Sequence, residues 1–213
     1  YYAFLDWNGF DASGTFVGLA NFREIIGDEL FWNAIKNTFL FLATAAPLRF
    51  VAALLLALLL NGALVPAKGF FRTVIFTPVV TTGAIIGIIM GILLDPAAGP
   101  VNSLLIATGL LDRPVNFLAT ANTAFPTAVV IWSWKWLGVT LIYWLAALQT
   151  IPDELYEAGI IDGGGPVTLF FRITLPLLIP FGAIIFLITA VEATRVFDLM
   201  LTLTGGGPYF STE

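Results

Sequence analysis

Five ionisable side chains lie within or next to long apolar stretches of the sequence, where a charge is difficult to accommodate. They are Arg49, Lys135, Glu192, Arg195 and Asp198. A charge at the centre of a bilayer costs at least about 2.5–3.5 kcal/mol, so we expect these side chains to face a bundle interior or a water-filled cavity. For Arg49, near the middle of its stretch, the plainer interpretation is a structural ion pair with an acid on another helix.

Two tryptophans accompany one of these charges. In the sequence WSWKW, Trp132, Lys135 and Trp136 are three or four residues apart or adjacent, and therefore share one side of a helix. Indole rings can pack on the C–H-rich faces of sugar rings, while Lys135 donates hydrogen bonds to sugar hydroxyl groups. The alternative interpretation is an aromatic belt at the membrane interface.

The last apolar stretch carries three charges close together. Glu192 and Arg195 are three residues apart, so a helix would let them pair locally, and Asp198 would continue the same face. A solvated end of the span is the alternative. The candidate pathway for a polar solute consists of Trp132, Lys135, Trp136, Glu192, Arg195 and Asp198.

The sequence also excludes several kinds of bond chemistry. Its 213 residues include no Cys and no His, which removes thiol nucleophiles, disulfides, histidine bases and the usual zinc ligands. It contains no phosphate-binding G-x-x-x-x-G-K-[ST] motif and no basic tract for nucleic acid. We therefore predict a chain that is not an enzyme, with no metal, no cofactor and no nucleic-acid partner. The competing class, an intramembrane enzyme, would lack a recognisable pair of catalytic acids.

The composition is that of a protein surrounded by membrane lipid. The chain is 59% hydrophobic and 11% charged, with a mean hydropathy of +0.95, whereas soluble domains carry about 25% charge. A helix needs about 20 apolar residues to cross a bilayer. Four stretches qualify, at about residues 36–60, 71–94, 123–148 and 174–199. The predicted fold class is all-α, a polytopic transmembrane helix bundle.

Two smaller features concern the second span and the loop after it. Gly83, Gly87 and Gly91 are four residues apart, a spacing that forms a smooth stripe and lets another helix approach closely. The apolar run at 103–111 is too short to cross a bilayer and is expected to form an interfacial or re-entrant helix.

An acidic, glycine-rich loop at 149–173 separates the third and fourth spans. Pro152, followed by two acids, suits the start of a helix, because proline lacks the N–H and acids favour the positive helix end. Glycines 163–165 would end that helix, and Pro166 would begin another. The pattern predicts a helix–turn–helix elbow. Lys68 and Arg72 mark the 61–72 loop as cytoplasmic, and two further spans place the elbow on the same side.

Residues of this elbow resemble a known motif. Glu157-Ala158-Gly159, then Asp162-Gly163, and further on Ile173, Leu175 and Pro176, resemble the E-A-A-x-x-x-D-G…I-x-L-P loop of ABC importer permeases. In that family the loop is cytoplasmic and fits a cleft on an ATPase subunit. The resemblance therefore implies an ATPase-coupling role for Glu157, Ala158, Gly159, Asp162 and Gly163. Gly159 departs from the motif, which has a second alanine there.

Flanking segments resemble the sugar-importer branch of that family, of the maltose and glycerol-phosphate type. They are FVGLANFREI (16–25), FWNAIKNT (31–38), FFRTVIFTP (70–78) and LTGGGPYFSTE (203–213). The resemblance covers nearly the whole chain. It implies that residues 1–213 form a single transmembrane permease domain, with the 149–173 coupling loop inside it and a further span beyond each end.

The function that the resemblance implies is ATP-driven import of a carbohydrate, meaning an oligosaccharide or related polyol, by alternating access. The implied partners are a second homologous permease subunit, a cytoplasmic ATPase dimer and an extracytoplasmic substrate-binding protein. The implied location is the prokaryotic cytoplasmic (inner) membrane, which the chain crosses several times. The alternative function is an ATP-independent channel or facilitator for small polar solutes.

Overall fold

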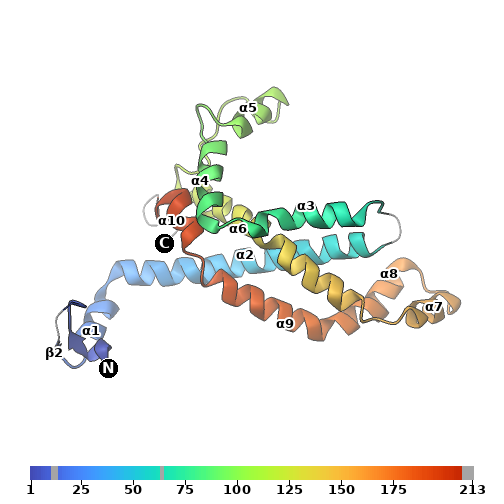
Figure 1. The fold of residues 1–213 in the computed structure, drawn as a ribbon, viewed down its shortest axis with the longest axis horizontal. Helices are drawn as coiled ribbons and strands as arrows, with labels where there is room; N and C mark the ends of the chain where they lie inside the picture. The colour runs from blue at the N-terminus through green and yellow to red at the C-terminus, as the bar shows by residue number, and fades with distance from the viewer. Residues whose placement is uncertain (11–13, 63–64, 208–213) are drawn as a thin grey trace.

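The described part of the chain is predominantly helical, which confirms the predicted all-α class (Figure 1). A computed structural model describes residues 1–10, 14–62 and 65–207. Two short strands, β1 (Leu5–Asp6) and β2 (Thr15–Phe16), pair antiparallel after a 3-10 turn, η1 (Tyr2–Phe4). The helices are α1 (Ala20–Gly27), α2 (Glu29–Asn61), α3 (Lys68–Val80), α4 (Gly83–Leu93), α5 (Pro100–Ala107), α6 (Ala121–Leu148), α7 (Asp153–Ile161), α8 (Pro166–Leu169), the π-helix η2 (Phe170–Thr174), α9 (Leu175–Ala193) and α10 (Asp198–Thr204).

The bundle is built on the crossing of α2 and α6, which pack against each other more extensively than any other pair of described elements. Ala45, Arg49, Ala53 and Ala57 recur every four residues along α2, so they share one face, and each is at most 1% exposed. Three alanines on this face let the α6 backbone approach closely. The indole N–H of Trp144 on α6 then donates to the backbone oxygen of Phe50, 3.2 Å away.

Buried apolar residues form two clusters along the bundle. The first joins α2, α4, α6 and α10 around Trp132, Ala46 and Leu199. The second joins α2, α6 and α9 around Trp144 and Leu178. The two clusters lie at different positions along α2 and α6.

Three of the four predicted spans are continuous helices over most of their length. Helices α2 and α6 contain the predicted 36–60 and 123–148 spans, and an unbroken helix of 28 residues runs over Pro166–Ala193. The prediction for the end of the fourth span is wrong, because this helix stops at Ala193 and α10 starts only at Asp198.

The second predicted span is sharply bent. Helices α3 and α4 meet at Thr81–Thr82 with an angle of 101° between them. Thr82 adopts an extended conformation, and its hydroxyl accepts a hydrogen bond from the Ile85 N–H, which caps α4. The residues that the structure describes therefore include three helices long and apolar enough to cross a membrane, or four spans if the bent pair counts as one.

The glycine stripe on α4 packs against α10, a partner that the sequence did not identify. A Cβ atom at Gly83 would lie 2.7 Å from the Asp198 carboxyl carbon, and one at Gly87 would lie 3.1 Å from the Leu199 backbone oxygen. Nothing lies within 4 Å of the corresponding position at Gly91. The packing prediction is thus confirmed for two of the three glycines.

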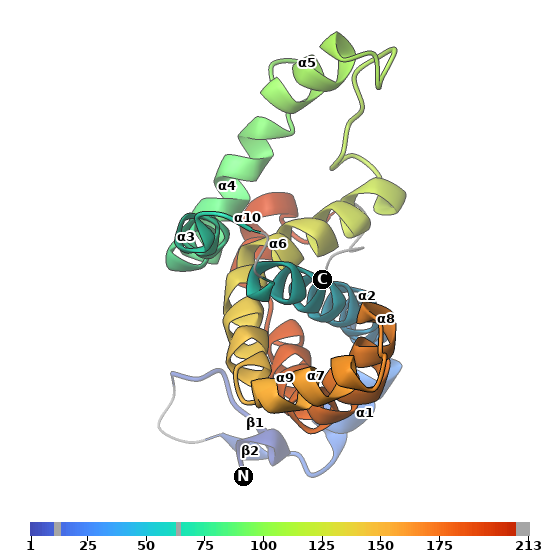
Figure 2. The same ribbon diagram turned by 90° about the vertical axis from the view of Figure 1, so that its right-hand side faces the viewer.

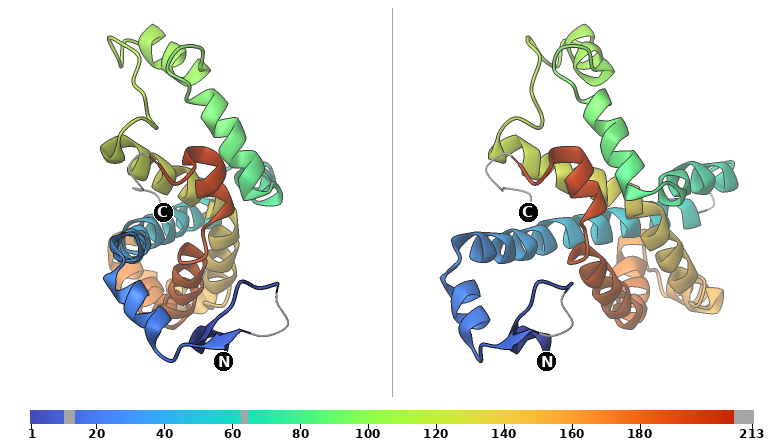
Figure 3. Two further views of the ribbon diagram at one scale, coloured as in Figure 1. Left: turned by 90° about the vertical axis from the view of Figure 1, so that its left-hand side faces the viewer. Right: turned by 60° about the vertical axis from the view of Figure 1, so that its left-hand side comes forward.

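Different elements lie at the two ends of the bundle. The strands and α1 lie at the start of α2, whereas α7 and α8 lie at the opposite end of the bundle (Figures 1 and 3). Helices α4 and α5 project from the bundle as an arm, with α5 at its tip (Figure 2). Helix α5 covers much of the short apolar run at 103–111, and its position relative to a membrane stays a prediction.

Candidate functional site

The elbow has the predicted construction. Helix α7 carries Asp153 and Glu154 in its first turn, and Pro166 is the first residue of α8. Gly163 has a φ of +82°, the left-handed conformation that glycine adopts without strain. The Gly164 N–H donates to the Gly159 backbone oxygen at 2.9 Å, which closes the end of α7.

Four of the five predicted coupling residues are exposed on the elbow. They are Glu157, Ala158, Asp162 and Gly163. Exposed apolar side chains surround them, including Ile160 at 61% and Ile161 at 85% exposure. Acidic and apolar groups are thus presented together at the end of the bundle.

Gly159, the fifth coupling residue, faces inward. A Cβ atom there would lie 2.5 Å from the Leu169 Cδ2 atom and 3.0 Å from the Ile173 Cδ1 atom. An alanine would therefore force these side chains to move. The departure from the second alanine of the motif has a local physical reason, namely close packing of α7 on the start of the fourth span.

All six residues of the predicted pathway line one cavity of about 150 Å³. Trp132, Lys135 and Trp136 come from the middle of α6, Glu192 from the end of α9, and the other two from the segment that follows. Three further residues line the cavity and were not among the predicted pathway residues, namely Gly83, Val196 and Leu199. Contact of a substrate with this cavity stays a prediction.

Lys135 is held beneath an indole ring. Its side chain is only 2% exposed, and its Nζ atom lies 3.8 Å from the centroid of the Trp136 ring. A cation over an aromatic face is stabilised electrostatically, more so when water is excluded. The arrangement leaves one flat aromatic surface and one cation together at the cavity wall.

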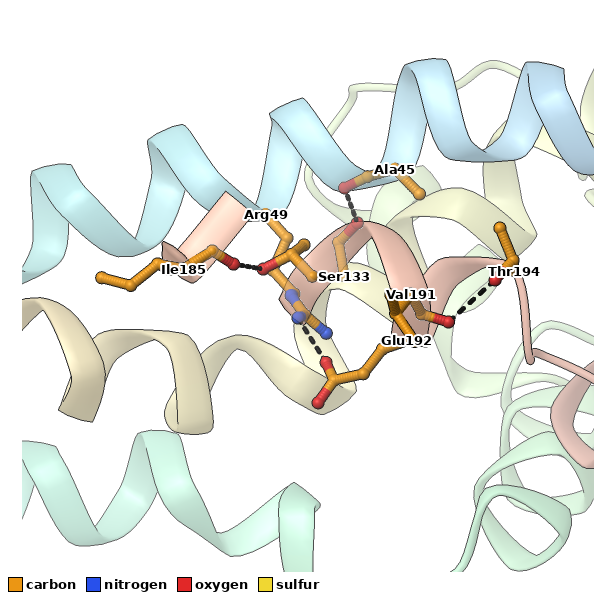
Figure 4. Close-up of polar contacts among 8 residues, drawn as sticks. Ala45, Arg49, Ser133, Ile185, Val191, Glu192 and Thr194 are labelled. Atoms are coloured by element: carbon orange, nitrogen blue, oxygen red, sulfur yellow. Dashed lines mark hydrogen bonds and ion pairs between the residues drawn. The ribbon is translucent and has the colours of Figure 1, made fainter. Parts of the chain in front are cut away.

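Arg49 forms an ion pair with Glu192, and so confirms the interpretation of a partner on another helix. The Nη2 atom of Arg49 lies 2.5 Å from the Glu192 Oε2 atom, and the second carboxylate oxygen points away from the guanidinium (Figure 4). The guanidinium carbon also lies 4.6 Å from the centroid of the Trp132 ring. Arg49 thus contacts two residues that line the cavity, Glu192 and Trp132.

This pairing corrects the prediction that Glu192 pairs locally with Arg195. Helix α9 ends at Ala193, so Glu192 and Arg195 do not share a helical face, and Asp198 does not continue one. Among the described residues, the ion pair found within 4.0 Å is that between Arg49 and Glu192. Arg195 and Asp198 reach the cavity from the irregular segment and from the first residue of α10.

The charged groups occupy the junction between the two apolar clusters. On α2, Arg49 lies between Ala46 of the first cluster and Ala53 of the second; on α6, Lys135 lies between Trp132 and Leu141. Both charges are near the midpoints of their helices. The polar cavity is therefore located about halfway along the bundle.

Comparison with known proteins identifies one family of membrane transport proteins. Residues 63–212 match the family described as "binding-protein-dependent transport system inner membrane component". The chain is 33% identical to the probable ABC transporter permease protein YurN of Bacillus subtilis (strain 168), over 100% of this chain and 73% of that protein. It is 33% identical to the sn-glycerol-3-phosphate transport system permease protein UgpA of Agrobacterium fabrum, over 97% of this chain and 69% of that one.

A solved structure has the same fold. It is the crystal structure of a bacterial ABC transporter involved in the import of the acidic polysaccharide alginate. The match has a TM-score of 0.81 and 29% sequence identity, and it covers 92% of this chain and 68% of the matched chain. A second crystal structure, of an alginate ABC transporter with its pentasaccharide-bound periplasmic protein, matches with a TM-score of 0.79.

Proposed function

Because the chain belongs to the family of binding-protein-dependent transport system inner membrane components, we propose that it is the membrane-spanning subunit of an ATP-driven carbohydrate importer. The proposed location is the bacterial inner membrane. The proposed partners are a second permease subunit, an ATPase pair on the cytoplasmic side and a substrate-binding protein outside. An ATP-independent facilitator would have no use for an exposed acidic elbow.

The observation that carries this proposal is the cavity halfway along the bundle. It brings together two indole rings, two cations and two carboxylates from α6 and from the end of α9 onwards. Indole faces provide a surface for the apolar faces of a sugar ring. The carboxylates of Glu192 and Asp198 accept hydrogen bonds from hydroxyl groups, and Lys135 donates them.

The charges around the cavity leave one cation in excess. Glu192 is paired with Arg49, so Asp198 is the remaining acid of the lining and faces two cations, Lys135 and Arg195. Such a lining can bind hydroxyl groups, and its excess cation can also bind an acidic or phosphate group on a carbohydrate. The names of the relatives cover both kinds of substrate, with an sn-glycerol-3-phosphate system and a lactose system among them. The proposed substrate class is therefore a carbohydrate of either charge, and uptake of labelled probes distinguishes the two.

The elbow is the proposed contact with the ATPase subunits. Its exposed acids and isoleucines form a surface suited to a cleft with cationic and apolar groups. The end of α2 and the start of α3 lie at the same end of the bundle as α7 (Figure 1). Lys68 is the first residue of α3, and its Nζ atom donates to the Asn61 backbone oxygen at the end of α2. This common end supports a cytoplasmic elbow under the positive-inside rule.

In the proposed alternating-access mechanism, the fourth span connects the elbow with the cavity. Closure of the ATPase pair moves the elbow, the elbow moves the fourth span, and the span opens the cavity to one side or the other. The substrate passes without any covalent step. The chain itself supplies binding groups and a mechanical connection.

The test is uptake into vesicles that contain the complete importer. The labelled probes are lactose, an arabino-oligosaccharide, an alginate oligosaccharide and glycerol 3-phosphate, each offered with and without internal ATP. We expect at least one of these carbohydrates to accumulate only with ATP, and Glu157→Lys to abolish accumulation while the subunit still inserts. Equal entry without ATP, or unchanged uptake by Glu157→Lys, would contradict the proposal.

A further inference from the structure

A single hydrogen bond links the elbow helix to the start of the fourth span. The Tyr156 hydroxyl and the Thr174 Oγ1 atom are 2.9 Å apart. Thr174 is only 4% exposed, and the Tyr156 ring packs against the second apolar cluster. Thr174 is buried and the bond is part-buried, so the loss of either hydroxyl group would leave the other without this partner.

Thr174 is the last residue of a π-helical turn, η2. The Leu175 N–H donates to the Phe170 backbone oxygen, five residues back. Pro176 has no N–H, so it cannot donate the regular α-helical hydrogen bond to the Arg172 backbone oxygen. Short π-helical turns inside α-helices are frequent at functional sites. The contact with α7 is therefore made at an irregular turn, where the direction of the span can change without unfolding it.

A second contact between α7 and the span is apolar. Gly159 approaches the Leu169 and Ile173 side chains closely. Apolar packing holds the two segments together but lets them slide, because it has little directional preference. Within the part of the chain that the structure describes, the Tyr156–Thr174 bond is the direct polar link between an α7 side chain and η2 or α9.

The span that receives this contact leads to the cavity. Helix runs without interruption from Pro166 to Ala193, and Glu192 lies next to its end. Eighteen residues separate Thr174 from Glu192, a length of about 27 Å in a helix. A displacement at Thr174 thus moves the carboxylate that pairs with Arg49 and lines the cavity.

We propose that Tyr156 and Thr174 are positioning residues whose hydrogen bond transmits movement of the elbow to α9 and hence to the cavity. The inference rests on the proposed coupling of the elbow to an ATPase. Tyr156 is not one of the motif residues that mark the elbow surface. Its role is to convert docking at that surface into movement of the span.

The experiment follows the cavity directly and needs no identified substrate. The chain has no cysteine, so Val196→Cys places one thiol in the cavity wall. The complete importer, with partner subunits free of reactive cysteines, is reconstituted in nanodiscs. The labelling rate with a maleimide is measured without nucleotide and with ATP plus vanadate. The ATPase that copurifies and the basal rate of hydrolysis are measured on the same samples.

In this background, Tyr156→Phe and Thr174→Val should each reduce the ATP-dependent change in labelling about fivefold, the factor that one neutral hydrogen bond represents. The double variant should lose no more than either single variant, because both remove the same bond. Thr174→Ser, which keeps a hydroxyl, should retain the change. The matched control is Tyr2→Phe, which should behave as the parent. Tyr2 lies in η1, outside the elbow and the fourth span, and is 64% exposed.

The proposed function and this inference fail in different ways. If ATPase subunits do not copurify with the parent chain, the coupling function itself is wrong, and the inference is overturned with it. If they copurify and Tyr156→Phe keeps the full change in labelling, only the inference is overturned. Additive losses in the double variant would overturn it as well.

Discussion

Arg49 on α2 and Glu192 on α9 are 143 residues apart in sequence and form an ion pair at the junction of the two apolar clusters. Arg49 is 1% exposed, whereas the Glu192 side chain is 31% exposed because it also faces the cavity. The pair therefore joins a fully buried cation to a partly hydrated acid. This asymmetry leads to a stability prediction.

Removal of the acid should destabilise the subunit more than removal of the cation. Glu192→Leu leaves Arg49 buried without its partner, a change that costs about 3–5 kcal/mol. Arg49→Met leaves a carboxylate that the cavity can hydrate, so its cost should be smaller. The double variant should be more stable than Glu192→Leu alone. Thermal unfolding of the purified subunit in detergent measures all three, and equal losses in both single variants would contradict this explanation.

The packing of α4 on α10 gives a prediction with an internal control. Gly87→Ala should destabilise the subunit by about 1–3 kcal/mol, because the new methyl group would meet the Leu199 backbone oxygen and the Thr202 side chain. Gly91→Ala, one helical turn further on, meets nothing within 4 Å and should be close to neutral. Thermal unfolding again provides the comparison. Similar effects at both positions would show that the close approach is not decisive.

Inside the elbow, the size of residue 159 should control ATPase binding. Gly159→Val should push α7 away from Leu169 and reduce the amount of copurifying ATPase, since the exposed surface would no longer be presented in register. Adding Leu169→Ala should restore binding by making room. Gly165→Ala, with nothing within 4 Å, is the matched control. Failure of Leu169→Ala to restore binding would contradict the steric explanation.

Thiol labelling tests the orientation of the chain. Because the sequence contains no cysteine, single substitutions can be introduced without removing any native thiol. A cysteine at Gly164 should react with an impermeant reagent only from the cytoplasmic side, and one at Asn116 only from outside. The reverse pattern would overturn the orientation and the role proposed for the elbow.

Long apolar helices could be predicted from sequence because hydrophobic length alone defines them. The predicted 36–60 and 123–148 spans lie inside α2 and α6. Pro78, inside α3, favours a kink in the second span. The 101° angle at Thr81–Thr82 could not be predicted, because both halves of that span are apolar and the angle depends on packing of α4 against α10. Likewise, nothing in the local sequence after Ala193 requires the helix to stop there.

The candidate cavity residues were identifiable for a different reason. Charges are costly in hydrocarbon, so the physics requires them to gather, and the structure gathers all six predicted residues around one cavity. An ion pair of Arg49 with an acid on another helix was predicted, but the acid was not identifiable, since a spacing of three residues allowed Glu192 to pair locally with Arg195. Only the fold brings Arg49 to Glu192. The sequence signal that Arg49 faces another helix is the four-residue spacing of Ala45, Arg49, Ala53 and Ala57, all of which are buried in the structure.

We propose that a carbohydrate passes through this cavity while the ATPase subunits drive the cycle. The most direct measurement compares Trp136→Ala and Asp198→Ala with the parent importer in vesicles, recording uptake of the transported sugar and ATP hydrolysis stimulated by loaded receptor. We predict that uptake falls at least about tenfold in each variant, the factor that corresponds to about 1.4 kcal/mol, while stimulation by the receptor is retained. Normal uptake by both variants would contradict the account and return these residues to roles in packing.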